Sequence, residues 1–275
     1  MAEGSVYDLE HFSNDLDYLL AQEKESIVFR DNAQDLLRKL LSNQEFIADV
    51  LDKMVSDDTV LKGKIGTIDR NDIMVHLSSK GNFSMRLFVW APLAFSPIHD
   101  HGAWGVIGAL AGQVEETKYR RLDDGSKEGY AKIEQVSTAL LNPGDTSHVS
   151  VFDDGIHKTG NSGDTVSLSL HVYGRAVRKG FIQCFNMEEN SVHNLVTPKL
   201  EKRLFAVKAL GALSPTLAKT SIEKAFHDPH PLVRWESIKA MEQIDKAGWI
   251  TLLKEAASDS DEGVRKKANV LLNKT

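Results

Sequence analysis

The chain has 275 residues, enough for one large domain or two smaller ones, and its composition of 41% hydrophobic and 26% charged residues is that of a globular protein. The formal net charge of −6 argues against nucleic acid as a partner, because phosphate binding needs a basic surface. A single cysteine, Cys184, excludes an internal disulfide and is typical of a reducing compartment.

The beginning of the chain, MAEGSVYDLEHF, lacks the basic and apolar regions of a secretory signal. No stretch approaches the roughly 20 apolar residues that a membrane-spanning helix needs. We therefore expect a soluble cytoplasmic protein with neither a membrane nor a nucleic acid as its partner.

Three regions follow one another along the chain. Residues 1–60 predict a helical segment that packs on the next region, because the apolar residues of DNAQDLLRKLLSNQEFIADVLDKMV recur at helical spacing. Residues 61–195 contain short apolar runs, among them MRLFVW, WGVIGALAG and TVSLSLHVY, separated by Gly, Pro, Asn and Asp. Such short strands predict a mainly β fold, an antiparallel barrel or sandwich, in which RLDDGSKEGY is a hairpin connection.

The last region, residues 196–275, is predicted to be helical again and contains an internal repeat. Asp and Arg residues recur 31 positions apart: Asp228 with Asp259, Arg203 with Arg234, and Arg234 with Arg265. This pattern resembles HEAT repeats, in which Asp and Arg brace the turn between helices, and about two and a half units are present. The repeats are interpreted either as a helical cap on the barrel or as a surface for a protein partner.

The stretch SPIHDHGAWGVIGALAGQ contains two histidines two positions apart, His99 and His101. Side chains alternate along a strand, so both imidazoles lie on one face and can converge on one ion. Imidazole binds Fe, Zn, Cu and Ni alike, so the ligand type does not name the metal. Without a further ligand, two surface histidines would explain the pattern equally well.

A third histidine, His157, stands in DDGIHKTGN, where a returning strand can lie beside the first pair. Three neutral imidazoles would leave about three coordination positions for substrate and dioxygen, as in a catalytic rather than a structural site. The alternative third ligand is His148, which follows the turn in PGDTSHVSVF.

The strand SLSLHVYG places polar side chains on one face. On an extended strand this face consists of Ser167, Ser169, His171 and Tyr173. One interpretation is a polar face exposed to solvent. The other is a row that faces into a barrel, where the phenol can hydrogen-bond a ligand of the metal or relay a proton.

In this order, PIHDH, GALAGQVEET, GIHKTGN and SLHVY resemble the cysteine dioxygenase, or thiol dioxygenase, family of the cupin superfamily over residues 65–190. The resemblance implies a double-stranded β-helix barrel that holds Fe(2+), and a reaction in which both atoms of O2 are added to a thiol sulfur to give a sulfinate. It also implies the site residues. The metal ligands would be His99, His101 and His157, and the catalytic row would be Ser169, His171 and Tyr173.

One position departs from the usual cupin pattern. Counting back from Gly112, the place of the carboxylate ligand is taken by Gly105, so the metal would have three neutral ligands. In mammalian-type cysteine dioxygenases a Cys at this place is cross-linked to the Tyr of the row. The resemblance therefore implies an unmodified Tyr173, as in bacterial-type members. Glu116 matches a family glutamate and is expected to brace the barrel.

The part of the site that holds the far end of the substrate departs from the family. Cysteine dioxygenases clamp the substrate carboxylate with the Arg of a Tyr-x-Arg segment, and 3-mercaptopropionate dioxygenases have Gln instead. Here Arg70 takes that place without the Tyr, and Arg86, on a strand that can turn it inward, is the other candidate. Trp104 is interpreted either as part of the pocket wall or as a buried structural residue, and Cys184 is interpreted as buried structure.

The predicted function is thus iron-dependent oxidation of a small thiol, cysteine or a relative such as 3-mercaptopropionate. One alternative is a three-histidine cupin that uses O2 to cleave carbon–carbon bonds, for which the SLHVY row has no evident use. The other is a non-catalytic metal-binding cupin that acts as a sensor or as a scaffold through the helical repeats.

Overall fold

The computed structural model describes residues 6–22, 26–56 and 72–274, and the chain divides into two compact units. The first unit comprises residues 1–122 and 133–195, and the second comprises residues 123–132 and 196–275. Arg70, a predicted substrate residue, lies outside the described residues. In the described part of the chain no helix is long and apolar enough to cross a membrane.

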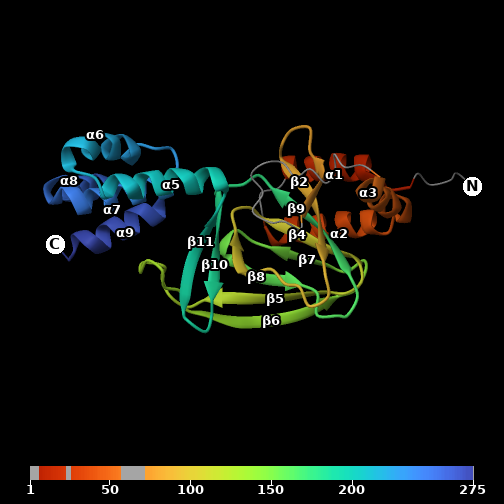
Figure 1. The fold of residues 1–275 in the computed structure, drawn as a ribbon. Helices are drawn as coiled ribbons and strands as arrows, with labels where there is room; N and C mark the ends of the chain where they lie inside the picture. The colour runs from red at the N-terminus through yellow and green to blue at the C-terminus, as the bar shows by residue number, and fades with distance from the viewer. Residues whose placement is uncertain (1–5, 23–25, 57–71, 275) are drawn as a thin grey trace, which may run out of the picture. The chain divides into compact units, whose positions relative to one another are not determined.

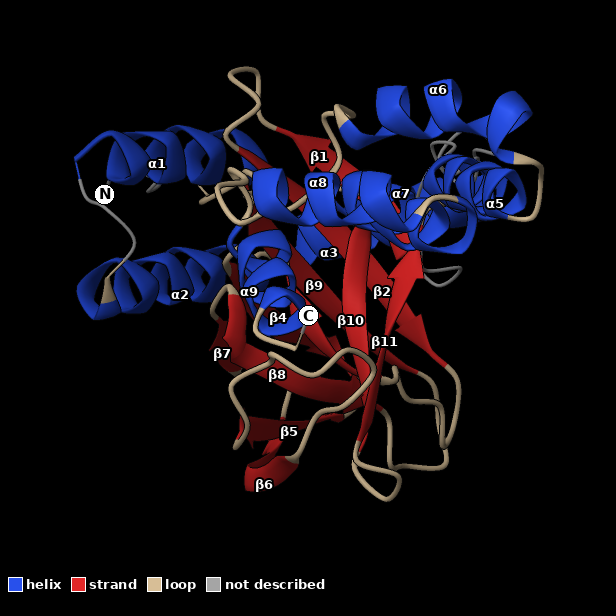
Figure 2. Cartoon of the chain, turned by 90° about the vertical axis from the view of Figure 1, so that its left-hand side faces the viewer, coloured by secondary structure: helices blue, strands red, loops and turns tan. Residues whose placement is uncertain are grey.

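Two antiparallel sheets form the first unit (Figures 1 and 2). The first sheet has the order β1 (Asp72–Leu77), β2 (Phe83–Trp90), β9 (Ser167–Gly174), β4 (Gly105–Ala111), β7 (Thr146–Val149). The second has the order β11 (Ser191–Val196), β10 (Phe181–Asn186), β3 (Ile98–His101), β8 (Phe152–Gly160), β5 (Val114–Arg121), β6 (Ile133–Leu141). The prediction of a mainly β fold, a double-stranded β-helix barrel with helical additions, is confirmed.

Residue alternation sorts the strands of the first sheet into two faces. On β4, Val106 and Leu110 join the apolar cluster of the N-terminal helices, whereas Ile107 and Ala109 belong to a cluster shared with Val114 of the second sheet. The second cluster also includes Leu141, Val149 and, at its edge, Tyr173. From Gly105 to Ala109, the odd-numbered positions of β4 therefore face the interior between the sheets, and the even-numbered ones face the helices.

Three helices cover the outer face of the first sheet, beside β2, β9 and β4 (Figure 1). They are α1 (Leu9–Gln22), α2 (Ile27–Leu41) and α3 (Gln44–Ser56). Ser26 caps α2 by accepting a hydrogen bond from the Phe29 amide. Gly108 allows α2 to approach β4, because a Cβ there would collide with Leu41 and Leu37. The predicted N-terminal helical segment is therefore present and buries its apolar face on the barrel.

The second unit consists mainly of paired helices (Figure 1). They are α5 (Pro198–Gly211), α6 (Pro215–Phe226), α7 (Pro231–Ile244), α8 (Lys246–Ala256) and α9 (Glu262–Leu272). The connection between β5 and β6, the predicted hairpin, also belongs to this unit through residues 123–132. Within it, Glu128 accepts hydrogen bonds from Trp235 Nε1 at 3.0 Å and Lys239 Nζ at 3.1 Å.

The 31-residue repeat has a direct physical basis in the arginines. The guanidinium of Arg234 donates to the carbonyl oxygens of Asp228 and Pro229, and 31 positions later Arg265 donates to those of Asp259 and Ser260. The Asp–Arg braces that the sequence predicts are thus present, and they link successive turns: Arg203 pairs with Asp228, and Arg234 with Asp259.

Helix α9 differs from the corresponding helix α7 at two positions of the repeat. The positions of Trp235 and Ile238, buried in α7, are taken in α9 by the polar residues Lys266 and Asn269. Helix α9 therefore presents polar, exposed side chains at two positions where α7 buries apolar ones.

Candidate metal centre

Three histidines converge in the interior of the barrel. His99 and His101 come from β3 and His157 from β8, where His99 and His157 are direct partners in the antiparallel register. Directly opposite residues project from the same face, so the register brings the third imidazole to the first two. The ring nitrogens lie within 4.8 Å of one another, and His101 Nε2 is 2.8 Å from His157 Nε2.

Hydrogen bonds behind two of the rings orient them. His99 Nδ1 lies 2.9 Å from the carbonyl oxygen of Pro97, and His157 Nδ1 lies 2.8 Å from Glu116 Oε1. Both partners are acceptors, so each Nδ1 carries the proton and each Nε2 presents a lone pair. In His157 that lone pair faces His101, as a metal ligand requires.

Burial keeps His99 and His101 neutral. Desolvation, together with the charge of a neighbouring histidine, lowers the pKa of His99 to about 3, and it lowers the pKa of His101 well below its ordinary value. Among the described residues, no carboxylate or thiol joins the cluster as a ligand. Three neutral imidazole donors fit a first-row transition metal such as iron, zinc, copper or nickel.

His148, the alternative third ligand, is placed elsewhere. It lies on β7 opposite Val106, whose side chain packs on the helix-facing side of the sheet. Because partners share a face, His148 projects away from the interior. The structure therefore brings His157, and not His148, to the first two histidines.

The predicted row on β9 faces the interior and is continuously hydrogen-bonded. Ser169 Oγ lies 2.7 Å from His171 Nε2, and His171 Nδ1 lies 2.9 Å from the Tyr173 hydroxyl. Trp90 Nε1 donates to Ser169 Oγ at 2.9 Å. The Tyr173 ring stacks on the ring of His101 at a centroid distance of 5.5 Å, which places the end of the row at the histidine cluster.

The indole of Trp90 gives this chain a direction. Because Trp90 can only donate, Ser169 accepts from it and is free to donate its own proton to His171 Nε2. His171 then carries its proton on Nδ1 and donates it to the Tyr173 oxygen. Burial lowers the pKa of His171 to about 3, so its ring is neutral. The Tyr173 oxygen is thus held in place by the His171 ring.

Gly105 leaves room for the tyrosine. It is the direct partner of Tyr173 between β4 and β9, and a Cβ at Gly105 would lie only 2.8 Å from the Tyr173 ring. A carboxylate or a thiol at this position would collide with the ring in its present place. The position that carries a metal ligand in the usual cupin pattern is here occupied by the face of Tyr173.

Glu116 has a closer connection to the cluster than its sequence position indicates. The sequence predicted a brace for the barrel, but the Glu116 carboxylate bonds directly to His157. Its position could have been inferred only from the pairing of β5 with β8, in which Glu116 lies opposite Thr159. That pairing is not written in the local sequence of either strand.

The predicted substrate residues Arg86 and Trp104 lie on opposite faces of the first sheet. Arg86 lies opposite His171 in the register of β2 with β9, on the same face as Phe88, whose ring is 4.3 Å from that of His171. The Arg86 guanidinium is paired with Asp72, whose other carboxylate oxygen is buried and has no hydrogen bond to any residue that the structure describes. The inward direction expected from alternation is thus present, and the charge of Arg86 is shared with Asp72.

Of the two interpretations of Trp104, the structure supports the buried structural residue and not the pocket wall. The indole belongs to the apolar cluster under the N-terminal helices and meets the Phe29 ring edge-on, at a centroid distance of 4.9 Å. Since Gly105 faces the interior, its neighbour Trp104 faces outward. Cys184 is buried as expected, and its partner in the register of β10 with β3 is His99.

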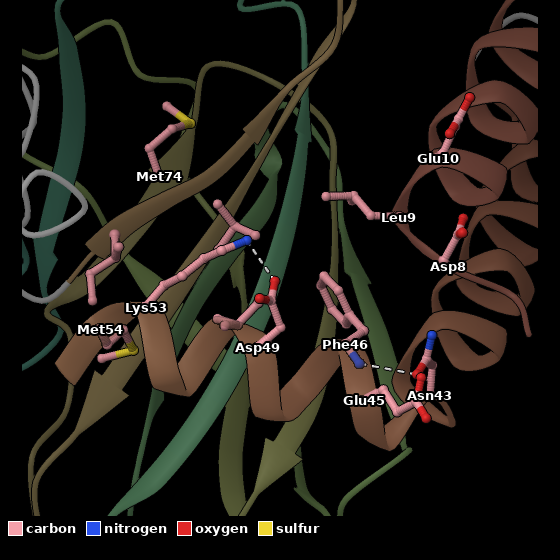
Figure 3. Close-up of a pocket in the computed structure, with 13 residues that line it drawn as sticks. Asp8, Leu9, Glu10, Asn43, Glu45, Phe46, Asp49, Lys53, Met54 and Met74 are labelled. Carbon is pink, nitrogen blue, oxygen red and sulfur yellow. Dashed lines mark hydrogen bonds and ion pairs between the residues drawn. The ribbon is translucent and has the colours of Figure 1, made fainter. Parts of the chain in front are cut away.

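A cavity of about 450 Å³ lies outside the barrel interior, between α1, α3 and β1 (Figure 3). Leu9, Phe46 and Ile73 line it together with acidic side chains such as Glu10 and Glu45. It is on the helix-covered side of the first sheet, and no predicted site residue lines it. This cavity is therefore separate from the histidine cluster.

Comparisons with known proteins give one family match and several structural similarities. Residues 194–273 match the family model of HEAT repeats. The chain is similar to a cupin-superfamily sugar phosphate isomerase from Silicibacter pomeroyi, with 16% identity, coverage of 50% of this chain and 89% of that one, and a TM-score of 0.31. It is also similar to a recombinant oxalate oxidase in complex with glycolate, with 19% identity, coverage of 43% and 58%, and a TM-score of 0.31.

A third similarity is to the DMSP lyase DddQ from Ruegeria pomeroyi, with 16% identity, coverage of 36% of this chain and a TM-score of 0.26. The match spans 41% of the length of that lyase. The strand order and the inward-facing histidines, rather than these likenesses, define the barrel.

Proposed function

We propose that the barrel is a non-haem iron-dependent thiol dioxygenase that oxidises a small thiol to its sulfinate. The observation that supports this most is the meeting of two features in one interior. Three neutral imidazoles converge there, and the hydroxyl of Tyr173 reaches the same place at the end of the chain from Trp90. Resemblance to the cysteine dioxygenase family names the reaction that uses both.

Fe(2+) held by His99, His101 and His157 would supply the place where a thiolate and O2 are brought together. In the overall reaction, the O–O bond breaks, two S–O bonds form on the sulfur, and the thiol proton is released to water. Sulfur loses four electrons, which O2 accepts, so no other oxidant or reductant is required.

The protein contributes a neutral ligand set and a directed proton. With no carboxylate ligand, the divalent charge is left for the anionic thiolate to balance. The Tyr173 hydroxyl would donate a hydrogen bond to the reacting sulfur or oxygen atoms, and His171 and Ser169 hold the phenol in place. Gly105 permits the ring position that this requires.

Arg86 is the described residue that we propose to hold the far end of the thiol. It lies one strand away from His171 on the inner face of the barrel. Asp72 already binds the guanidinium, so a substrate carboxylate would have to share it, whereas the open oxygen of Asp72 can accept from an amine. The pair therefore favours a small thiol whose far end is not a lone carboxylate.

The proposal is tested by loading the protein with ferrous iron without oxygen, then measuring oxygen uptake with cysteine, 3-mercaptopropionate and cysteamine. We expect uptake with at least one thiol and its sulfinate by mass spectrometry. Iron binding without oxidation of any thiol would overturn the proposal and favour the carbon–carbon-cleaving or the non-catalytic cupin.

A further inference from the structure

Glu116 is a buried carboxylate beside the histidine cluster. It lies on β5 opposite Thr159 of β8, two residues before Lys118, which is the direct partner of His157. Side chains two positions apart on a strand share a face, so Glu116 projects into the interior. Only 2% of the residue is exposed.

Both oxygens of this carboxylate have defined partners. Oε1 accepts from His157 Nδ1 at 2.8 Å, and Oε2 accepts from the Ser147 hydroxyl. Lys118 Nζ is 3.8 Å from Oε2 and donates to the His148 carbonyl oxygen. Thr159 Oγ1 lies 3.2 Å from the same His157 nitrogen. The carboxylate is thus fixed in one orientation, aimed at the back of His157.

The surroundings of Glu116 compensate its burial. Each carboxylate oxygen accepts a hydrogen bond, and the cationic Lys118 Nζ lies 3.8 Å from Oε2. The three imidazoles are neutral donors, and Gly105 occupies the place of the usual carboxylate ligand. A carboxylate therefore lies behind one of the ligands, His157.

We propose that Glu116 is a positioning residue that acts through His157. It fixes the tautomer of His157 with the proton on Nδ1 and holds the ring so that Nε2 faces the other imidazoles. Its carboxylate acts on the metal through the His157 ring, in place of the direct carboxylate ligand that Gly105 cannot provide. This inference rests on the proposed metal centre, and it adds a residue that the resemblance interpreted only as a brace. Carboxylate-to-imidazole hydrogen bonds of this kind strengthen metal binding about 10–100-fold.

Two substitutions separate the charge from the hydrogen bond. In Glu116→Gln the amide oxygen can still accept from His157 Nδ1, but the charge is gone. In Glu116→Ala both are lost. Metal affinity should therefore fall in both variants, and it should fall further in Glu116→Ala, by about 10–100-fold.

The chain offers a matched control on the same strand. Glu115 is the neighbouring glutamate, and because side chains alternate it projects from the opposite face of β5. Glu115→Gln removes a carboxylate charge one position away from Glu116, from the opposite face of β5. It should leave metal affinity unchanged.

The experiment measures Co²⁺ affinity and its visible absorption spectrum in the full-length protein, which needs no thiol. The ring tautomer of His157 is measured without metal by ¹⁵N NMR. We expect weaker Co²⁺ binding, an altered spectrum and more of the Nε2-protonated tautomer in Glu116→Ala, and none of these in Glu115→Gln. A purely structural brace would not change the tautomer.

Unchanged Co²⁺ affinity and tautomer in folded Glu116→Gln and Glu116→Ala would overturn the inference. If Glu116→Ala does not fold, Ser147→Ala decides, because it frees Oε2 and should weaken binding by a smaller factor; no effect there, with none in Glu116→Gln, overturns the inference. Failure of the wild type to bind Co²⁺ overturns the metal centre and this inference together. Metal binding without thiol oxidation overturns only the proposed reaction.

Discussion

The barrel and the helical repeats bury their polar groups in opposite ways. The barrel places imidazoles and hydroxyls at its centre, including His157, Ser169 and His171. The repeat unit has an apolar core and keeps its charges in the turns, where Arg234 binds Asp259. Burying polar groups costs stability unless each is satisfied.

The difference lies in what satisfies those groups. In the repeats, the donor and the acceptor of each arginine hydrogen bond both belong to the protein, and the bonds to the turn carbonyls recur in successive repeats. In the barrel, the partners behind the rings come from the chain, but the Nε2 atoms of His101 and His157 face each other. The repeats are thus arranged for their own stability, and the barrel interior is arranged for a cation.

The largest expected effect is the loss of the metal. His157→Ala should lower iron affinity by more than about 100-fold and abolish thiol oxidation, since it removes a ligand rather than its support. Iron content after dialysis checks this. His148→Ala is the control, because His148 projects toward the helices, and loss of iron in that variant instead would contradict the ligand set.

The next effect separates chemistry from binding. Tyr173→Phe should retain iron but lower the turnover number by about 100-fold, because it removes the proton donated at the end of the row. Ser169→Ala should have a smaller effect, since the phenol remains. Steady-state oxygen uptake with iron content measured in parallel checks both variants. Full activity of Tyr173→Phe would remove the row from the mechanism.

The pH dependence of stability should distinguish the two units. Because burial holds the pKa of His99 and His171 at about 3, both rings are neutral when folded, whereas the unfolded chain takes up protons below its ordinary pKa of 6.5. Their contribution is complete above pH 6.5 and declines as the pH falls toward 3, by about 1.4 kcal/mol per pH unit for each ring.

The apolar core of the repeats contains no histidine among its described residues. Urea unfolding of the metal-free protein, followed by hydrogen exchange in each unit between pH 7 and 5, checks this contrast. We expect the barrel to lose protection first. Equal loss in both units would contradict the neutral interior.

The smallest effect concerns the repeat braces. Arg234 and Asp259 are almost buried, so Arg234→Ala should lower the free energy of unfolding of the repeats by about 2 kcal/mol. Arg203 is 42% exposed, so Arg203→Ala should cost less than about 1 kcal/mol. Denaturant unfolding measures both. Weaker iron binding in either variant would contradict the separation of the two regions.

Local patterns were sufficient to predict much of the site. Residues two positions apart on a strand project from the same face. This rule predicted that His99 and His101 share one face of β3. It also predicted that Ser169, His171 and Tyr173 share one face of β9. The same rule, once Gly105 is known to face the interior, shows that Trp104 projects from the opposite face and does not line the pocket. The sequence could not supply that face, since it depends on which side of β4 the helices cover.

The connection of Glu116 to His157 required information from two strands. Their sequences are about 40 positions apart, and either strand could pair in several registers. The repeat braces were easier to predict, because the same Asp–Arg pair occurs more than once along the chain. Repetition reveals a contact in the sequence, whereas a contact made only once needs the fold.

The central claim is that the three histidines form a centre that adds O2 to a thiol. The most direct measurement is a reaction of the iron-loaded protein with ¹⁸O2 and the thiol that gives the fastest oxygen uptake, followed by mass spectrometry of the product. We predict a sulfinate in which both oxygen atoms carry the label. A sulfinate with unlabelled oxygen, or disulfide as the only product, would contradict the account.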